Sequence, residues 1–201
     1  MKLFYSTGSC SLSPHIALLE AGLKFDLEKV DLATKKTTSG DFTKINPKGY
    51  VPALVLDNGD VLTEGAVIVQ YIADQKPEAK LLPKAGTFER YRAQEWLNFI
   101  STEIHKGFSP LFNKDIPEAS GKMIRENLAK RFEFLAQHFS KNSFLMGTQY
   151  TVADGYLFTV MSWSEHLKFD LTKWPTLMGF FERVKTRPAT HAAMKSEGLI
   201  K

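Results

Sequence analysis

The sequence predicts an α/β domain over residues 1–80, followed by an all-helical domain over residues 87–201. In the first 80 residues, short apolar runs alternate with patterns of helical period, whereas no convincing strand pattern follows them. The segment 77–87 is rich in Pro, Gly and Lys, which is typical of a linker. A chain of 201 residues is long enough for one large domain or two small ones, so its length is compatible with this division.

The first domain begins with a strand, a helix and a second strand. Leu3-Phe4-Tyr5 predicts a short buried strand, and an alternating pattern over residues 25–30 predicts the second. Between them, apolar residues at helical spacing indicate one helix face, and Gly22 is its expected end. These residues are Leu12, Ile16, Leu19 and Leu23. A βαβ unit implies that its two strands pair in parallel with a right-handed crossover.

A hairpin and a second helix complete the first domain. Residues 33–49 are polar and irregular, and we predict no element there. A strand headed by Pro52 covers residues 51–56, and the Asn58-Gly59 turn predicts a return strand at Val61-Leu62. We expect Thr63 to cap the following helix. That helix carries on one side Val67, Ile68, Tyr71 and Ile72.

Helices account for the second domain. Apolar stripes predict long helices over residues 88–106 and 118–139. A third helix is expected to begin at Thr151, where Asp154 can complete a capping box worth on the order of 1 kcal/mol. Two shorter helices are predicted over 175–186 and 189–197, each with a proline at its first turn.

Composition and charge exclude several classes of protein. With 43% apolar and 24% charged residues, the chain is an ordinary globular sequence. It has no apolar run near the roughly 18 residues of a membrane span, and its start has no signal-peptide core, so we expect a cytoplasmic protein without a membrane partner. The net charge of +4 comes without a dense basic run interleaved with aromatics, so we expect no nucleic-acid partner.

The single cysteine, Cys10, follows the first strand and precedes the first helix. Helix N-termini stabilise anions and lower thiol pKa values, so a reactive thiolate is one interpretation, and an inert buried cysteine is the other. Ser13 stands where a C-x-x-C redox pair would have its second cysteine, so this thiol could form a mixed disulfide but not resolve it. The histidines show no ligand spacing with Cys10, and we expect no metal.

Three further features have both a structural and a functional interpretation. Pro52 is an ordinary trans proline on the residues alone, whereas a cis bond would present the backbone of Val51 to an extended ligand. Glu64 either favours the dipole of the helix that follows it or receives a ligand's amino group. Polar residues at i, i+4 and i+7 on the helix 88–106 suit a ligand or a partner helix. These residues are Asn98, Thr102 and His105.

Several segments together resemble the glutathione S-transferases, and specifically the bacterial beta class. The resemblance runs over essentially the whole chain. The segments that carry it are MKLFY with GSCSLSPHIAL around Cys10, Asn46-Pro47-Lys48-Gly49 with Val51-Pro52-Ala53-Leu54, Leu62-Thr63-Glu64-Gly65 with residues 68–74, Trp96 to Ile100 with His105 to Phe108, and Gly147-x-x-Tyr150-Thr151-Val152-Ala153-Asp154.

The resemblance implies a thioredoxin-like N-terminal domain, an all-helical C-terminal domain and a cytoplasmic homodimer. The implied activity is conjugation of the glutathione thiolate to small, often hydrophobic electrophiles, as in detoxification, with glutathione as co-substrate and no metal. Alternatives are glutathione-dependent disulfide exchange or dehalogenation through Cys10, and a non-catalytic ligand-binding stress protein.

The resemblance also implies a role for individual residues. Cys10 would face the glutathione sulfur, Lys35 the glycyl carboxylate, and Val51, before a cis Pro52, the cysteinyl backbone. Glu64 and Gly65 would hold the γ-glutamyl end, although Gly65 lacks the serine hydroxyl that many members have there. Cys10 and His105 are the implied catalytic residues, with Tyr5, Ser9 and Ser11 as alternative thiol activators. A glutathione bound across the dimer interface would be reached by Asn98, Thr102, Glu103, Ile104 and His105. We expect the electrophile pocket to include Phe108, Phe112 and Trp163.

Overall fold

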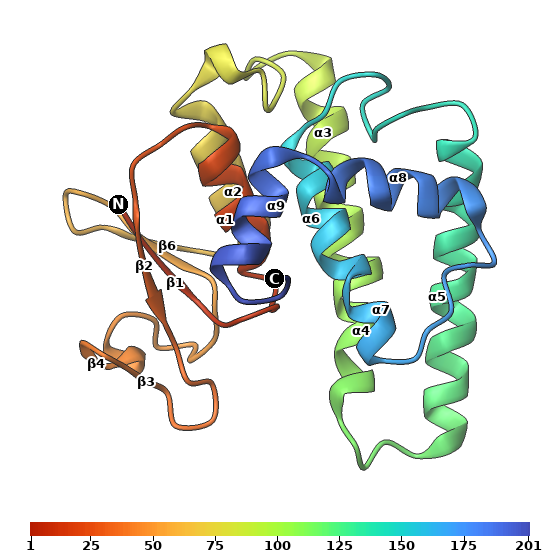
Figure 1. Cartoon of the computed structure of the whole chain (residues 1–201), viewed down its shortest axis with the longest axis horizontal. Coiled ribbons are helices and arrows are strands. Elements are labelled where there is room, and N and C mark those ends of the chain that lie inside the picture. The colour runs from red at the N-terminus through yellow and green to blue at the C-terminus, as the bar shows by residue number, and fades with distance from the viewer. The chain divides into compact units, whose positions relative to one another are not determined.

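The computed structural model describes residues 1–201, which divide into two compact units (Figure 1). The first unit comprises Met1–Leu82 and Arg187–Lys201, and the second comprises Pro83–Thr186. The last helix, α9 (Pro188–Ser196), therefore belongs with the α/β unit, whereas we expected residues 87–201 to form one helical domain. The reason is that α9 packs against α1 (Leu12–Glu20).

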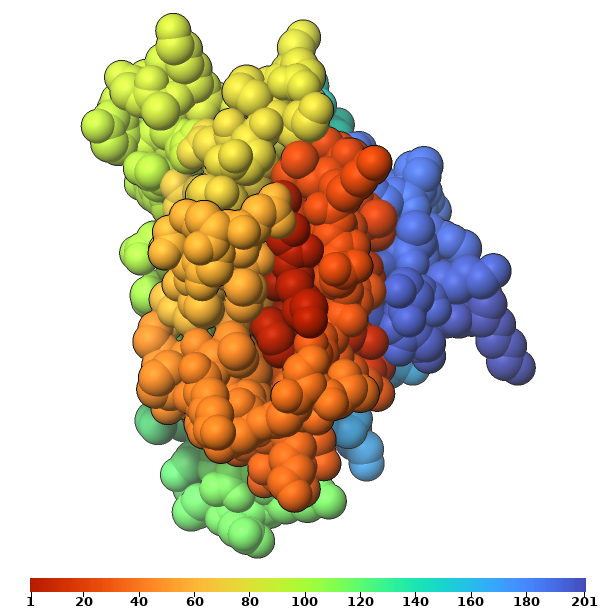
Figure 2. Space-filling view, turned by 90° about the vertical axis from the view of Figure 1, so that its left-hand side faces the viewer, coloured from red at the N-terminus to blue at the C-terminus, as the bar shows by residue number.

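A four-stranded sheet of order β2-β1-β5-β6 forms the first unit. β1 (Lys2–Tyr5) pairs in parallel with β2 (Asp26–Lys29), as the βαβ pattern predicts. β5 (Ala53–Val55) is antiparallel both to β1 and to β6 (Val61–Thr63), which confirms the predicted hairpin. Figure 2 shows the start of the chain, in dark red, between the segments that carry β2 and the β5–β6 hairpin.

The first helix is buried on nearly all sides. Leu12, Ile16 and Leu18 are completely buried, whereas Leu19, which we expected on the buried face, is only half-buried. Both α2 (Gly65–Asp74) and α9 pack against α1, so its apolar surface is wider than a single stripe. The chain turns at Gly22, whose positive φ of 62° favours glycine, and the predicted end of the helix is confirmed.

The second helix begins differently from the prediction. Thr63 is the last residue of β6 and does not cap α2. Glu64 takes the N-cap position instead, with φ 69° and ψ 109° and no capping hydrogen bond from its side chain. Val67 is 45% exposed, contrary to expectation. The buried face consists of Ile68, Val69, Ile72 and Ala73.

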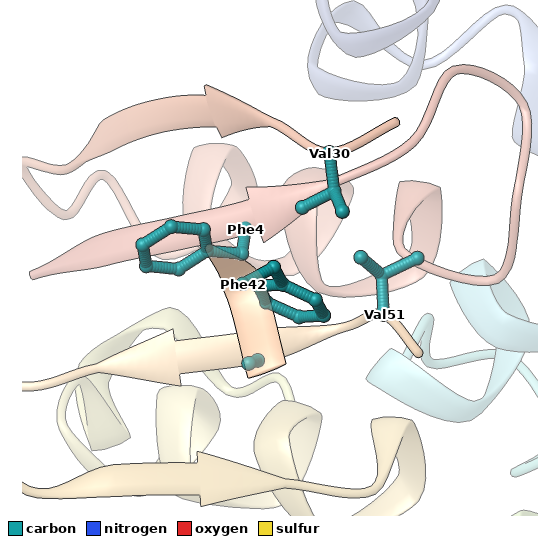
Figure 3. Packing of buried hydrophobic residues seen from close by; sticks show 5 residues of the cluster. Phe4, Val30, Phe42 and Val51 are labelled. Carbon is teal, nitrogen blue, oxygen red and sulfur yellow. The ribbon is translucent and has the colours of Figure 1, made fainter. Parts of the chain in front are cut away.

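Residues 33–49, where we predicted no element, contain a short hairpin and a 3-10 turn. β3 (Lys36–Thr37) pairs with β4 (Gly40–Asp41), and the 3-10 turn η1 (Phe42–Lys44) follows. Phe42 is completely buried, because it enters a core cluster on one face of the sheet (Figure 3). The cluster comprises Phe4, Val30, Phe42, Val51 and Ala53. A further 3-10 turn, η2 (Pro77–Ala79), lies in the segment predicted as a linker.

The second unit is all-helical, as predicted, with no strand. Its elements are α3 (Phe88–Phe99), the π-helical segment η3 (Ile100–His105), α4 (Lys106–Phe108), the 3-10 turn η4 (Ser109–Phe112), α5 (Glu118–Phe139), α6 (Val152–Met161), α7 (Trp163–His166) and α8 (Pro175–Lys185). The predicted regular helix over 88–106 is thus interrupted by a π-helical turn. No helix of the chain is both long and apolar enough to cross a bilayer.

The predicted capping box of α6 is confirmed and extended. Both Asp154 carboxylate oxygens accept hydrogen bonds: one from the Thr151 backbone N–H at 2.8 Å and the Thr151 hydroxyl at 3.0 Å, the other from the Leu145 N–H at 2.8 Å. Burial raises the pKa of Asp154 to about 6, although these donors oppose the rise. The Asp154 side chain therefore joins the loop before α6 to the helix itself.

Candidate active site

The predicted site residues of the first unit gather around the Val51–Pro52 peptide bond, which is cis. The residues alone favour a trans proline, and the resemblance implied the cis form that the structure has. Val51 is 4% exposed, and its side chain points into the core cluster (Figure 3). Because the side chain is held in the core, the backbone of Val51 is fixed in place at the start of β5.

Cys10 lies in the loop between β1 and α1, one residue before the N-cap residue Ser11. Its side chain is half-buried, and Sγ donates to the Val51 carbonyl oxygen at 3.3 Å. The predicted location at the start of the first helix is therefore confirmed. This contact brings the lone thiol next to the backbone that the resemblance assigns to the glutathione cysteinyl group.

The three alternative thiol activators surround the same loop. Ser11 is completely buried, and its hydroxyl donates to the Ser6 carbonyl at 3.2 Å and lies 2.8 Å from the Ser9 hydroxyl. Ser11 therefore stabilises the loop. Burial, and secondarily the negative charge of Glu197, raise the pKa of Tyr5, so its phenol stays protonated at neutral pH.

Lys35 lies beside the loop that leads to Val51. It has a positive φ of 58°, which is uncommon for a non-glycine residue. A Cβ atom built on Gly49 would lie 3.7 Å from Lys35 Cε, so the aliphatic part of the lysine lies along that glycine. Gly49 has a φ of 69°, so a larger residue there would be strained as well as close to the lysine.

Glu64 and Gly65 lie on the other side of the cis bond. A Cβ atom built on Gly65 would lie 3.8 Å from Pro52 Cγ, so the start of α2 rests on the proline ring. The exposed Glu64 carboxylate pairs with the Lys48 ammonium and lies 3.4 Å from the Tyr50 hydroxyl. The sequence reasoning missed Lys48 and Tyr50 as partners of Glu64, although both belong to the segment that leads to Pro52.

Backbone conformation independently singles out two of these residues. Non-glycine residues with positive φ are Lys35, Glu64, Lys80 and Lys168. Such conformations cost roughly 1–3 kcal/mol each and cluster at functional sites. Lys35 and Glu64 are both residues that the resemblance assigns to glutathione, one for each end of the tripeptide.

In the second unit, the three polar residues predicted to lie on one face of the helix 88–106 do not share a face. Asn98 and Thr102 are exposed, and the Thr102 hydroxyl donates to the Asn98 carbonyl at 3.0 Å. His105 is half-buried and turns toward α6 and α7, where Nδ1 lies 2.7 Å from the Tyr156 hydroxyl and the ring packs against Trp163. The π-helical turn explains this, because it changes the angular spacing that i, i+4 and i+7 have in a regular helix. Tyr156 was missed by the sequence reasoning.

Glu103 and Ile104, the residues of η3 that precede His105, differ in how far their side chains are exposed. Glu103 forms an ion pair with Arg131 on α5, with 2.7 Å between Oε2 and Nε. Ile104 is completely buried, so only its backbone could contact a ligand. Glu103 is therefore held in a fixed orientation by α5, but its carboxylate is already paired.

The predicted electrophile pocket is only partly supported by the packing. Phe108 is completely buried among Phe132, Phe169 and Trp163, so we correct it to a residue of the aromatic core. Phe112 is 47% exposed and packs edge-on against Trp163, with their ring centroids 5.5 Å apart. These two rings form an aromatic surface with one exposed and one buried member.

Comparisons with known proteins identify the family of this chain. Residues 7–75 match the model of the glutathione S-transferase N-terminal domain, and residues 99–188 match that of the C-terminal domain. The chain is 44% identical over 200 residues to glutathione S-transferase GstA of Escherichia coli O157:H7, covering 99% of this chain and 100% of that protein.

Solved structures show the same similarity over the full length. A sphingomonad glutathione S-transferase complexed with glutathione is 41% identical, with a TM-score of 0.96 and full coverage of both chains. A bacterial beta class glutathione S-transferase of Sphingomonas chungbukensis is 44% identical, again with a TM-score of 0.96 and full coverage of both chains. The predicted combination of a thioredoxin-like domain and an all-helical domain is thus confirmed, and the chain belongs to the glutathione S-transferase family.

Proposed function

We propose that this protein binds glutathione around the cis Val51–Pro52 bond and transfers its thiolate to small, often hydrophobic electrophiles. The observation that carries the proposal is the convergence of three separate segments on residues 49–52, which contain that bond. Cys10 donates to the Val51 carbonyl, Lys35 lies along Gly49, and Gly65 rests on Pro52. Residues far apart in sequence therefore meet at one place, as a ligand with several different groups requires.

Each group of the tripeptide has a suitable partner in this arrangement. The Lys35 ammonium suits the glycyl carboxylate, and the fixed backbone of Val51 suits an extended cysteinyl residue. Glu64 suits the γ-glutamyl amino group, and the backbone N–H of Gly65, at the start of α2, suits the γ-glutamyl carboxylate. The amino group has to compete with Lys48 for the Glu64 carboxylate.

The chemical step is attack of the glutathione sulfur on the electrophile. The positive end of the α1 helix dipole favours a thiolate near Cys10, and holding the two reactants together supplies much of the rate enhancement. A carbon–sulfur bond forms as the electrophile's leaving group departs, or as its double bond accepts the electron pair. We assign Phe112 and Trp163 to the electrophile side, because they provide apolar ring surface without a charged group.

We further propose that the protein acts as a homodimer in which the helical unit of one subunit contacts glutathione bound by the other. Asn98, Thr102, Glu103, the backbone of Ile104, and His105 are the residues assigned to this contact. Dilution tests it: activity per subunit should fall as light scattering shows conversion to monomers. Full activity in a verified monomer would contradict the shared site.

A second candidate activity is glutathione-dependent disulfide exchange or dehalogenation through Cys10. The position of this lone cysteine favours it, because the residue is only half-buried. Ser13 is 1% exposed and cannot resolve a mixed disulfide, so a second glutathione would have to release the first.

One panel of assays separates these activities. Electrophiles, halogenated compounds and small disulfides are incubated with glutathione and either the wild type or Cys10→Ala. Turnover of electrophiles by both proteins supports the transferase, whereas turnover of disulfides or halides by the wild type alone supports chemistry through Cys10. A non-catalytic stress protein would be retained on glutathione resin without turning over any compound.

We propose cytoplasmic detoxification as the role that fits a transferase with a permissive apolar surface.

A further inference from the structure

A buried carboxylate near the C-terminus contacts the loop that carries Cys10. Glu197 Oε2 accepts a hydrogen bond from the backbone N–H of Gly8 at 2.9 Å, and Oε1 lies 2.9 Å from His15 Nδ1. The side chains of Glu197 and His15 are 0% and 2% exposed. A buried carboxylate is costly unless its oxygens have partners, and here each oxygen has one.

The C-terminal residues also cover the same glycine by packing. Gly8 has a φ of 67°, and a Cβ atom built on it would lie 3.2 Å from Leu199 Cδ2. Leu199 itself is held by α9, because its backbone N–H donates to the Met194 carbonyl at 2.9 Å. Gly8 is thus fixed both by a hydrogen bond and by an apolar contact from the C-terminal segment.

The position of Gly8 is coupled to that of Cys10 through a short series of turns. The Ser9 N–H donates to the Ser6 carbonyl at 3.0 Å, and the Ser13 N–H donates to the Cys10 carbonyl at 3.2 Å. His15, the other partner of Glu197, lies on α1 just beyond this loop. Glu197 therefore joins the two ends of the segment that presents the thiol.

We infer that Glu197 and Leu199 are positioning residues, which hold residues 6–11 so that Cys10 Sγ stays against the Val51 carbonyl. The relevance to conjugation rests on the function proposed above, but the positioning itself does not. When the loop is released, the thiol loses its carbonyl acceptor and becomes more accessible, and glutathione loses the fixed spacing between Cys10 and Val51.

Alkylation by iodoacetamide tests this directly, because Cys10 is the single cysteine. Glu197→Gln preserves size but removes the negative charge and replaces one acceptor oxygen by an NH₂ group, so the charge-assisted hydrogen bonding to Gly8 N–H and His15 is weakened. We expect alkylation about tenfold faster than in the wild type, the equivalent of one lost hydrogen bond. Calorimetry should show weaker glutathione binding by a similar factor.

Glu20→Gln is the matched control. Glu20 pairs with Arg187 through bonds of 2.6 and 2.9 Å, at the opposite end of the same α1–α9 contact. This variant should alkylate at the wild-type rate and bind glutathione normally, since its contact lies away from the Cys10 loop. Equal acceleration in both variants would indicate general loosening and overturn the inference, as would an unchanged rate in folded Glu197→Gln.

Leu199→Ala covers the case in which Glu197→Gln does not fold. Leu199 is 38% exposed, so its truncation is tolerable, and it should accelerate alkylation in the same direction by a smaller factor. No acceleration in Leu199→Ala would also overturn the inference. Alkylation requires no turnover, so its outcome is independent of the assay panel. If the wild type turns over no compound, the proposed function is wrong, but the alkylation result still tests the positioning role.

Discussion

The thiol of Cys10 donates a hydrogen bond to the carbonyl oxygen of Val51, with 3.3 Å between sulfur and oxygen. This contact joins the start of α1 to the cis bond before β5. The carbonyl favours the neutral thiol, whereas the positive end of the α1 helix dipole favours a thiolate. Glutathione that pairs with the backbone of Val51 would compete for this carbonyl, so its binding is expected to change the environment of the Cys10 thiol.

Replacing Cys10 by alanine should separate two activities. Disulfide exchange should disappear, because the chain has no other cysteine. Conjugation should fall by about tenfold or less, since Cys10 offers the bound sulfur at most one hydrogen bond. Steady-state kinetics with an electrophile and with a small disulfide measure both. Equal loss of the two activities would show that Cys10 itself is the nucleophile in each.

Replacing His105 by alanine should weaken glutathione binding about tenfold without unfolding the protein, because one side-chain hydrogen bond to the ligand is lost. Titration calorimetry measures the affinity, and circular dichroism checks the fold. Tyr156→Phe removes the hydroxyl 2.7 Å from His105 Nδ1, so it should weaken binding by a smaller factor. Unchanged affinity in His105→Ala would contradict its assignment to the ligand.

Replacements of Glu64 should show that its backbone is strained and that its carboxylate is needed to bind glutathione. Its φ of 69° suits glycine better than alanine, so Glu64→Gly should be more stable than Glu64→Ala by about 1 kcal/mol. Both variants should lose glutathione affinity equally, since both lack the carboxylate. Urea unfolding and calorimetry give the two quantities. A Glu64→Ala variant as stable as Glu64→Gly would argue against strain at this position.

Loss of Asp154 should cost more than an ordinary helix cap. The side chain is completely buried, and Asp154→Ala leaves without an acceptor three donors, on Thr151 and Leu145. We expect a decrease of about 3–5 kcal/mol in the free energy of unfolding, against about 1 kcal/mol for a cap alone. Thr87→Ala is the comparison. Thr87 is an ordinary N-cap at the surface, and its side chain accepts one hydrogen bond, from the Arg90 N–H at the start of α3. Equal losses in urea unfolding would contradict the expected difference.

The free energy of unfolding should depend on Glu28 at acid pH. Burial alone would raise its pKa, but hydrogen bonds from Ser39 and Lys2 lower the pKa from 4.5 to about 2. Because the folded pKa lies below the unfolded one, the stabilisation is complete above pH 4.5 and is lost as pH falls toward 2. Relative to Glu28→Gln, the wild type should lose up to about 3 kcal/mol over this range. A constant difference between the two proteins in acid unfolding curves would refute the shift.

The sequence predicted the elements whose pattern is local. The βαβ unit, the Asn58-Gly59 hairpin and the capping box at Thr151 follow from periodicity and turn chemistry within a few residues. The gathering of Cys10, Val51 and Glu64 came from resemblance to a family, since no single-sequence pattern brings these positions together. Lys48 and Tyr50 were missed because their role depends on the path of the loop before Pro52.

Other features follow from packing between distant segments. Thr63 could not cap α2 because sheet pairing extends β6 to that residue. The π-helical turn at Ile100–His105 directs His105 to Tyr156 and Trp163, which a regular helix would not predict. The aromatic side chain of Phe108 suits a pocket or a core equally, and only its packing contacts in the folded protein show that it belongs to the core.

The amino-acid sequence by itself determined the two kinds of unit, the helices and strands of strong periodicity, and the location of the lone thiol at a helix start. The tertiary structure decided where the C-terminal helix packs, how Glu197 reaches Gly8, and which polar residues are turned inward. The physical reason is that periodicity and capping depend on neighbours in the chain, whereas burial and hydrogen-bond partners depend on segments as far as 189 residues apart.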